Sequence, residues 1–272
     1  MRKFHSFAVA ALAALALNGA HAGTITDNYT GGTGTYSSAE SIGGSDYAIS
    51  QASITRVNNV LNVVISTVFA GNATTVSGVK VGYGDLFLSN AWNPVGAVGS
   101  GYTTDNMANS GTIWKYALGI DSARYTTGAI TAAAVTLYQL GTPTGATTAA
   151  AINAANINTS DTVMKAAGMG TTNPVGYRYG QADTVKTTSL SVSDSLKDGT
   201  MTAANGLVSF SIDISGTDMM NWTSFAMHWG ETCQNDVIEG VTGVGSVPEP
   251  ASIALLGLGL AGLIAARRRK AA

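Results

Sequence analysis

The chain has 272 residues, of which only 11% are charged, and it carries 14 Lys and Arg against 16 Asp and Glu. Six of the cations lie near the two ends of the chain, so within residues 23–246 eight cations face 15 acids. Because this acidic body has no cluster of cations that could neutralise phosphates, its composition excludes nucleic acid as a partner.

The N-terminal end has the layout of a secretory signal peptide. Two cations open the chain, an apolar run follows at residues 7–17, and the small residues Ala20 and Ala22 flank one position. This pattern predicts cleavage before Gly23 by signal peptidase, after delivery by the general export machinery. An N-terminal membrane anchor is the alternative, but the apolar run is short and a cleavage site follows it.

Residues 23–240 are predicted to form an all-β domain, a single antiparallel β-sandwich of the jelly-roll kind. Gly is frequent, Pro is rare, and Thr, Ser and Val dominate, which suits short strands joined by turns. Residues 49–57 and 60–69 join through Asn58 and Asn59, which tolerate a left-handed turn and predict a hairpin. Further strands are predicted at residues 81–89, 114–120, 135–140, 207–214 and 222–229.

One segment breaks the strand pattern. Residues 142–172 contain an Ala-rich stretch of good helix formers, and Ser160 could cap a second helical turn. We expect a partly helical, mobile insertion within one domain. A disordered linker between two domains is the alternative, but the strands on either side are too few to close a core alone.

The densest group of chemically interesting side chains lies at residues 228–239. Cys233 is the single cysteine, which excludes an internal disulfide and leaves a nucleophile, an intermolecular bridge or a buried thiol. His228 shares a strand face with Ala226 and not with Trp229. The ligand types of His228, Cys233, Asp236 and Glu239 suit a metal, but their spacing matches no familiar zinc pattern, and no metal site is predicted.

Other candidate sites rest on scattered acids. Asp85 could contribute to a Ca²⁺ site, but no calcium-loop motif is present and a turn-capping role is favoured, so no cofactor is predicted. An acid pair such as Asp85 and Glu239 could serve an extracellular hydrolase, yet any β protein with 15 acids offers such pairs. The chain is therefore predicted not to be an enzyme.

The C-terminal end combines a proline motif, an apolar segment and a basic end. Residues 241–247 mix Gly, Ser and Val and are predicted to form a flexible stalk. Residues 251–266 contain no charge, and as a helix of about 24 Å they predict a transmembrane segment in a bilayer core of roughly 30 Å. A buried core helix is the alternative, but such helices are normally amphipathic. The flanking residues are Pro248, Glu249 and Pro250 in front, and Arg267, Arg268, Arg269 and Lys270 behind.

These three parts in this order resemble the PEP-CTERM sorting signal, in which an exosortase recognises the Pro-Glu-Pro motif and processes the tail. The resemblance implies a Gram-negative exported or cell-surface protein, anchored in the inner membrane before processing. It also implies a link to exopolysaccharide, biofilm or extracellular matrix.

Patches of the body resemble a group of exosortase-dependent surface proteins. They are the ending with His228, Trp229, Cys233, Asn235, Asp236 and Glu239, the stretches at 83–89 and 92–94, and the opening at 27–32. We therefore expect a structural or adhesive surface protein. A carbohydrate-binding matrix module that uses an exposed aromatic residue such as Trp92 is the alternative, and an extracellular hydrolase is a third.

Overall fold

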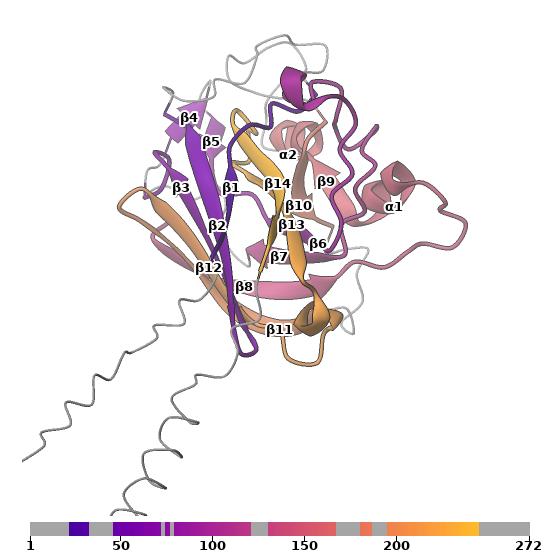
Figure 1. Ribbon diagram of the computed structural model, residues 1–272. Coiled ribbons are helices and arrows are strands. Elements are labelled where there is room, and N and C mark those ends of the chain that lie inside the picture. Colours follow the sequence, from indigo (N-terminus) through magenta and orange to yellow (C-terminus); the bar gives the residue numbers. More distant parts are fainter. Residues whose placement is uncertain are drawn as a thin grey trace, which may run out of the picture. The chain divides into compact units, whose positions relative to one another are not determined.

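Antiparallel β-strands form the framework of the body (Figure 1), and along some of them buried and exposed side chains alternate. The computed structural model describes residues 22–32, 46–71, 74–76, 79–120, 130–166, 180–186 and 195–244. The strands are β1 (Gly23–Thr26), β2 (Ile49–Val57), β3 (Val60–Thr67), β4 (Thr74–Val76), β5 (Val79–Val81), β6 (Leu86–Ser89), β7 (Tyr116–Ile120), β8 (Ala132–Gln139), β9 (Ile157–Thr159), β10 (Ala182–Val185), β11 (Ser195–Ala204), β12 (Leu207–Asp213), β13 (Ser224–Gly230) and β14 (Val237–Gly243). The helices are η1 (Val98–Ser100), α1 (Ala149–Asn156), α2 (Ser160–Ala166) and η3 (Asp218–Asn221).

Ten strands form one antiparallel sheet in the order β1-β2-β3-β12-β11-β8-β7-β6-β13-β14. This confirms the all-β prediction and corrects the two-sheet sandwich, because a single sheet curls until its edge strands β1 and β14 meet. The approach is close, since a Cβ on Gly240 would lie 2.7 Å from Ile25 Cγ2. Alternation along a strand reports one buried face, but it does not tell whether a second sheet or the far side of the same sheet covers that face.

The predicted hairpin between β2 and β3 is confirmed. Val57 pairs with Val60, and the turn residue Asn58 has φ of 55°. Asn tolerates this left-handed conformation better than most residues, which explains how a two-residue turn can form here.

Two hydrophobic clusters lie on opposite faces of one part of the sheet. The main cluster fills the inside of the curled sheet and contains Phe210 and Trp229. The second lies on the outer face and joins Phe87 and Ala226 of the sheet to Ile157 in β9. Strands β6, β7 and β13 are therefore buried on both faces, and polar side chains on their outer face are shielded from water.

The insertion predicted at residues 142–172 is helical in part, as expected. The Thr148 side chain accepts a hydrogen bond from the N–H of Ala151 (3.2 Å) and caps α1. The sequence did not predict that β9 follows α1 directly and pairs with β10. This small sheet, with α1 and α2, belongs to the layer that covers the outer face of the main sheet.

The C-terminal boundary of the body needs a correction. Residues 241–243, predicted as stalk, belong to β14, and the N–H of buried Val244 donates to Thr223 O (3.0 Å). Pairing with β13 overrides the flexibility that Gly would give an isolated chain. The predicted signal helix, the motif at 248–250, the apolar segment at 251–266 and the basic end at 267–270 lie outside the described residues. Among the residues that are described, no helix is long and apolar enough to span a membrane.

Candidate functional site

The candidate site lies on the outer face of the β13–β14 hairpin. His228 stands directly opposite Glu239 in the strand register, so the two side chains project from the same face. Ala226 shares this face, as predicted, and Trp229 points into the main core. The outer layer covers the pair, because only 1% of His228 and 5% of Glu239 is exposed.

Hydrogen bonds define where the protons of this pair lie. His228 Nε2 is 2.9 Å from the carbonyl oxygen of Ala182, which can only accept, so Nε2 carries a proton. His228 Nδ1 is 2.8 Å from Glu239 Oε2, and a second proton must lie between these two atoms. Trp92 Nε1 donates to the other oxygen of Glu239 at 2.8 Å. A donor at that position stabilises the negative carboxylate and so favours an ion pair between His228 and Glu239.

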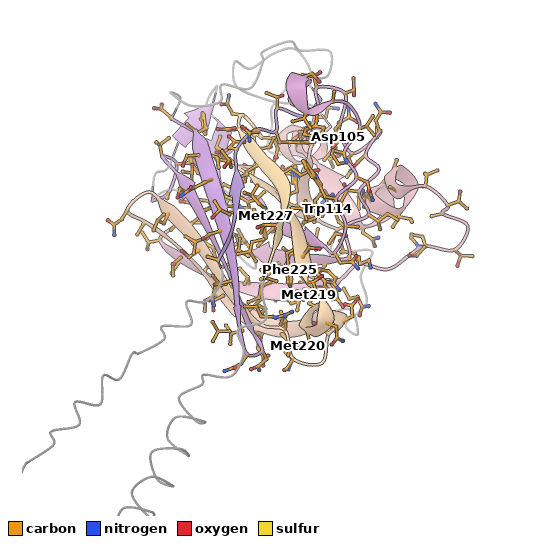
Figure 2. All side chains as sticks on the ribbon, in the orientation of Figure 1. Asp105, Trp114, Met219, Met220, Phe225 and Met227 are labelled. Atoms are coloured by element: carbon orange, nitrogen blue, oxygen red, sulfur yellow. The ribbon has the colours of Figure 1, made fainter. Side chains whose placement is uncertain are left out.

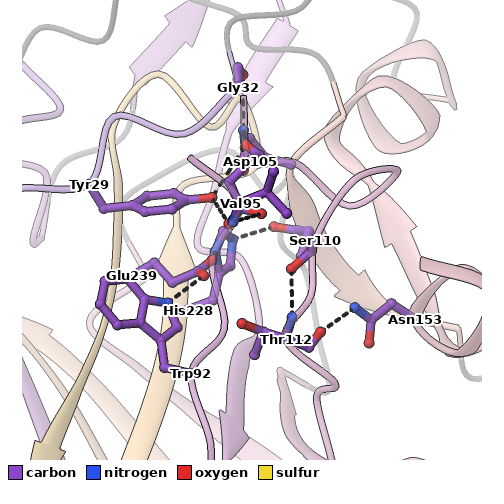
Figure 3. A network of polar contacts seen from close by, with 12 residues as sticks. Tyr29, Gly32, Trp92, Val95, Asp105, Ser110, Thr112, Asn153, His228 and Glu239 are labelled. Carbon is purple, nitrogen blue, oxygen red and sulfur yellow. Dashed lines mark hydrogen bonds and ion pairs between the residues drawn. The ribbon is translucent and has the colours of Figure 1, made fainter. Parts of the chain in front are cut away.

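A second acid, Asp105, comes from the long loop between β6 and β7. Tyr29 OH donates to its Oδ2 (2.9 Å) and the N–H of Val95 donates to its Oδ1 (3.1 Å), as Figure 3 shows. Burial is the largest influence on this carboxyl, followed by the charge of Glu239, and together they raise the pKa of Asp105 from 3.8 to about 6. The two hydrogen bonds oppose this rise, because they stabilise the carboxylate.

Amide side chains join segments of the covering layer to one another. Gln181 Nε2 donates to Gly32 O (3.0 Å), which links the N-terminal segment to the start of β10. On α1, Asn153 Nδ2 donates to Thr112 O (2.8 Å) and Asn153 Oδ1 accepts from the N–H of Trp114 (3.2 Å). Together with the β13–β14 hairpin, the network therefore joins five segments that are distant in the sequence (Figure 3).

A hollow lies between these groups. The empty space among these side chains is about 210 Å³, and this volume includes open solvent. Its lining consists of Tyr29, Asp105, Asn106, Met107, Ser110, Trp114, Gln181, Ala182, His228 and Glu239. The centres of water-sized spheres fit into only about 10 Å³ of this space, which is about what one water molecule needs. The hollow can thus take a water molecule or one hydroxyl-bearing end of a larger ligand, which carboxylate, imidazole and amide groups could bind by hydrogen bonds.

The loop that joins β13 to β14 contains three of the predicted candidates, and their contacts stabilise the fold. Asp236 Oδ2 accepts a hydrogen bond from the N–H of Ile49 (2.6 Å), which ties the loop to the start of β2. Cys233 is fully buried in the main core, and half-buried Asn235 follows it. Burial and the nearby Glu231 carboxyl raise the pKa of the Cys233 thiol well above its usual range, so a reactive thiolate is not favoured there.

Asp85 and Trp229 connect strands. Asp85 Oδ1 accepts from the N–H of Ile120 (2.8 Å) and Oδ2 from the N–H of Val185 (2.7 Å), so one carboxyl joins the end of β7 to β10. This corrects the predicted turn cap, because both donors are distant in the sequence. The indole Nε1 of Trp229 donates to Gly84 O (3.1 Å) from inside the core.

Of Asp85 and the candidates at residues 228–239, the structure brings only His228 and Glu239 together, and Trp92, considered for carbohydrate binding, joins this pair. Cys233 and Asp236 of the four-ligand set considered for a metal lie in the loop, with Cys233 in the core, away from the outer face. Within the described ranges, no three His, Cys, Asp or Glu side chains are arranged to hold a metal ion.

Sequence reasoning missed Asp105 and the roles of Tyr29 and Trp92. A signal for Asp105 was present, because it is the sole charged residue between positions 90 and 114. A lone acid in a long uncharged loop is a candidate for a buried partner. Tyr29, Trp92 and Glu239 also belong to three separate patches of the family resemblance, and the structure places these patches around one network.

Comparison with known proteins identifies the C-terminal segment. Residues 246–270 match the family model of the PEP-CTERM protein-sorting motif, which covers both the Pro-Glu-Pro motif and the basic end. No curated protein and no solved structure matches the chain. The chain therefore carries an exosortase sorting signal, which supports export and processing toward the cell surface.

Proposed function

We propose that the body is a non-enzymatic, structural or adhesive component of the cell surface or extracellular matrix, associated with exopolysaccharide. The observation that carries this proposal is the sorting motif at residues 246–270, which begins two residues after the last described residue of the β body. A chain that is exported and retained at the surface by its tail presents the folded body to the extracellular space.

The use of polar side chains supports a structural role. The carboxyls of Asp85 and Asp236 bind backbone N–H groups of distant strands, and Asp105 and Glu239 bind the covering layer. Buried acids that accept hydrogen bonds in this way stabilise one arrangement of segments. Cys233 is buried in the core, where an external substrate could not reach it.

Deletion of residues 247–272 tests the sorting part of this proposal. We expect the truncated body to fold and to leave the cell surface, because the motif and the predicted anchor are both gone. The matched control replaces Pro248 and Pro250 by Ala and leaves the apolar segment intact, so membrane retention should persist while processing stops. Unchanged surface retention of the truncated body, measured by fractionation and surface labelling, would contradict the proposal.

A second candidate function is carbohydrate binding, and the hollow favours it. Carboxylates, imidazole and amides line the hollow together with the rings of Tyr29 and Trp114, and half-buried Trp92 borders the network. Ring faces beside converging hydrogen-bonding groups suit a ligand that has both apolar C–H faces and hydroxyls.

Polysaccharide pull-down with two variants of Trp92 tests this function. Trp92→Ala removes the ring, and Trp92→Phe keeps an aromatic face but loses the donor to Glu239. If the ring binds sugar, Trp92→Ala should abolish capture and Trp92→Phe should retain part of it. No capture of any host polysaccharide by the unmodified body would leave the structural role as the better proposal.

A further inference from the structure

The loop between β13 and β14 buries side-chain oxygen atoms that its own hydrogen bonds leave unsatisfied. It covers residues 231–236, and Figure 2 shows β13 leading up to it through Met227. In the part of the chain that the structure describes, Glu231 Oε1, Gln234 Oε1 and Asn235 Oδ1 are shielded from solvent and accept no hydrogen bond. None of these three residues lines the hollow, so a ligand in the hollow would not satisfy them.

Two of these side chains converge on the backbone of Asp236. Glu231 Oε2 accepts a hydrogen bond from the N–H of Asp236 at 3.4 Å, so its carboxyl lies beside that residue. Gln234 Oε1 and Asp236 O lie 2.7 and 2.8 Å from the position that a Cβ on Gly230 would take, so these two oxygens are neighbours. Gln234 Nε2 donates to Glu231 O (2.7 Å), which fixes the orientation of the amide and identifies Oε1 as its oxygen.

Negative charge gathers at the same loop. Glu231 is fully buried, and burial, followed by the charges of Asp236 and Asp27, raises the pKa of its carboxyl well above the usual range. Asp236 is also fully buried, and its Oδ2 accepts from the N–H of Ile49 (2.6 Å). Buried acceptors without a donor cost stability, and a bound ion is one of the few groups that can satisfy several of them at once.

A calcium ion suits this set of oxygens better than a water molecule does. One water molecule donates two hydrogen bonds, whereas three acceptor oxygens here have no donor. Ca²⁺ takes roughly six to eight oxygen ligands, which include carboxylates, Asn and Gln side chains and backbone carbonyls. The lack of three suitably arranged His, Cys, Asp or Glu side chains among the described residues excludes only a site built from those side chains alone.

We propose that the β13–β14 loop binds one Ca²⁺ ion through the side-chain oxygens of Glu231, Gln234 and Asn235. The carboxylates of Glu231 and Asp236 balance the charge of the ion. Half-buried Asn235 marks the side of the loop from which the ion enters. Because Asp236 also accepts from Ile49 at the start of β2, the ion stabilises the contact between the last hairpin of the sheet and β2. This site goes beyond the proposed surface role and does not depend on it, since its ligands belong to the folded body.

Thermal unfolding of the full chain in a mild detergent, with EGTA or with CaCl₂, tests the site. With Ca²⁺ about 100-fold above its dissociation constant, Tm should rise by about 5–10 °C. Glu231→Gln keeps the shape of the side chain but removes its charge, so this variant should lose the rise. In EGTA the same variant should unfold at or above the Tm of the wild type, because repulsion by Asp236 and Asp27 is relieved. The matched control Asp198→Asn, which removes an exposed acid on β11, should keep the full rise.

Luminescence of Tb³⁺, which binds the same oxygen ligands as Ca²⁺, reports binding without reference to stability. Tyr83 pairs with Glu231 in a β-bridge and stacks on Trp229, so excitation of these rings should sensitise Tb³⁺ in the loop. Ca²⁺ should displace the Tb³⁺ and remove the signal. Gln234→Met deletes the amide oxygen at similar side-chain length and should weaken Ca²⁺ binding at least ten-fold, which keeps the test decisive if Glu231→Gln does not fold.

Two results would overturn the proposal. The first is a wild-type chain whose Tm does not respond to Ca²⁺ and which gives no sensitised Tb³⁺ signal, since Glu231 would then be buried as a neutral acid without an ion. The second is a Ca²⁺ response that Glu231→Gln and Gln234→Met both retain in full, because the ion would then bind elsewhere on the chain.

Discussion

The raised pKa of Asp105 makes a specific prediction for the Asp105→Asn variant. In the folded chain Asp105 holds its proton up to a pKa of about 6, whereas an unperturbed carboxyl releases it near 3.8. The folded state thus binds more protons than the unfolded chain within this window. The contribution of Asp105 to the free energy of unfolding should therefore fall as pH rises from about 4 to about 6 and stay lower above it.

The size of the effect follows from the change in pKa. At about 1.4 kcal/mol per pKa unit, the change from 3.8 to about 6 corresponds to a loss of about 3 kcal/mol at neutral pH. Asp105→Asn removes the charge but keeps one oxygen acceptor for Tyr29 or Val95, at a cost of about 1 kcal/mol for the weakened hydrogen bond. That cost applies at every pH, so the change in stability between pH 4 and pH 7.5 isolates the titration of Asp105.

Urea unfolding followed by Trp fluorescence at several pH values between 4 and 7.5 measures this difference. We expect the variant to gain about 2–3 kcal/mol relative to the wild type between the two ends of the range. The control is Asp198→Asn, which removes an exposed acid on β11. Parallel stability curves for Asp105→Asn and the wild type would refute the reasoning, because the titration of Asp105 would then not contribute to stability.

Four further predictions concern buried side chains of the body. Glu239→Ala should lower the free energy of unfolding in urea by about 3–5 kcal/mol, because it leaves buried His228 without its charged partner. A loss below about 1 kcal/mol would show that the pair is dispensable for stability. Asp85→Ala should lower the free energy of unfolding by about 2–5 kcal/mol, since it leaves two buried N–H donors unsatisfied. Asp85→Asn should lower it by less, because one oxygen acceptor remains. Equal losses for the two variants would contradict the geometry in which each carboxylate oxygen accepts one hydrogen bond. Cys233 should react with a thiol reagent only as the chain unfolds, and rapid modification of the folded chain would contradict its burial. Asp236→Asn should lower the free energy of unfolding by about 1–2 kcal/mol, because its hydrogen bond to the N–H of Ile49 becomes weaker. A loss of catalytic turnover without a loss of stability would instead support the hydrolase alternative.

Features that depend on neighbours in the sequence were predictable. The alternation at residues 207–214 predicted β12, and Asn58 and Asn59 predicted the β2–β3 turn, because both depend on side-chain period and local backbone conformation. The same holds for the Ala-rich helix α1. The sorting signal was also recognisable, since it is a linear motif at residues 246–270.

The candidate site depended on register and topology. His228 and Glu239 were both noted in the sequence, but only the register of the β13–β14 hairpin places them opposite each other. Asp105 and Tyr29 are 76 residues apart, and no periodic pattern links them. Their contact exists because the covering layer folds back over the outer face of the sheet.

The sequence by itself determined seven of the fourteen described strands and the sorting signal, because these depend on residues close together in the chain. Tertiary structure alone decided that ten strands form one sheet that curls on itself, and that four distant segments meet around His228 and Glu239. The physical reason is that a strand's pattern specifies which face is buried, whereas the identity of the covering segment depends on how strands with equivalent patterns pair over long distances.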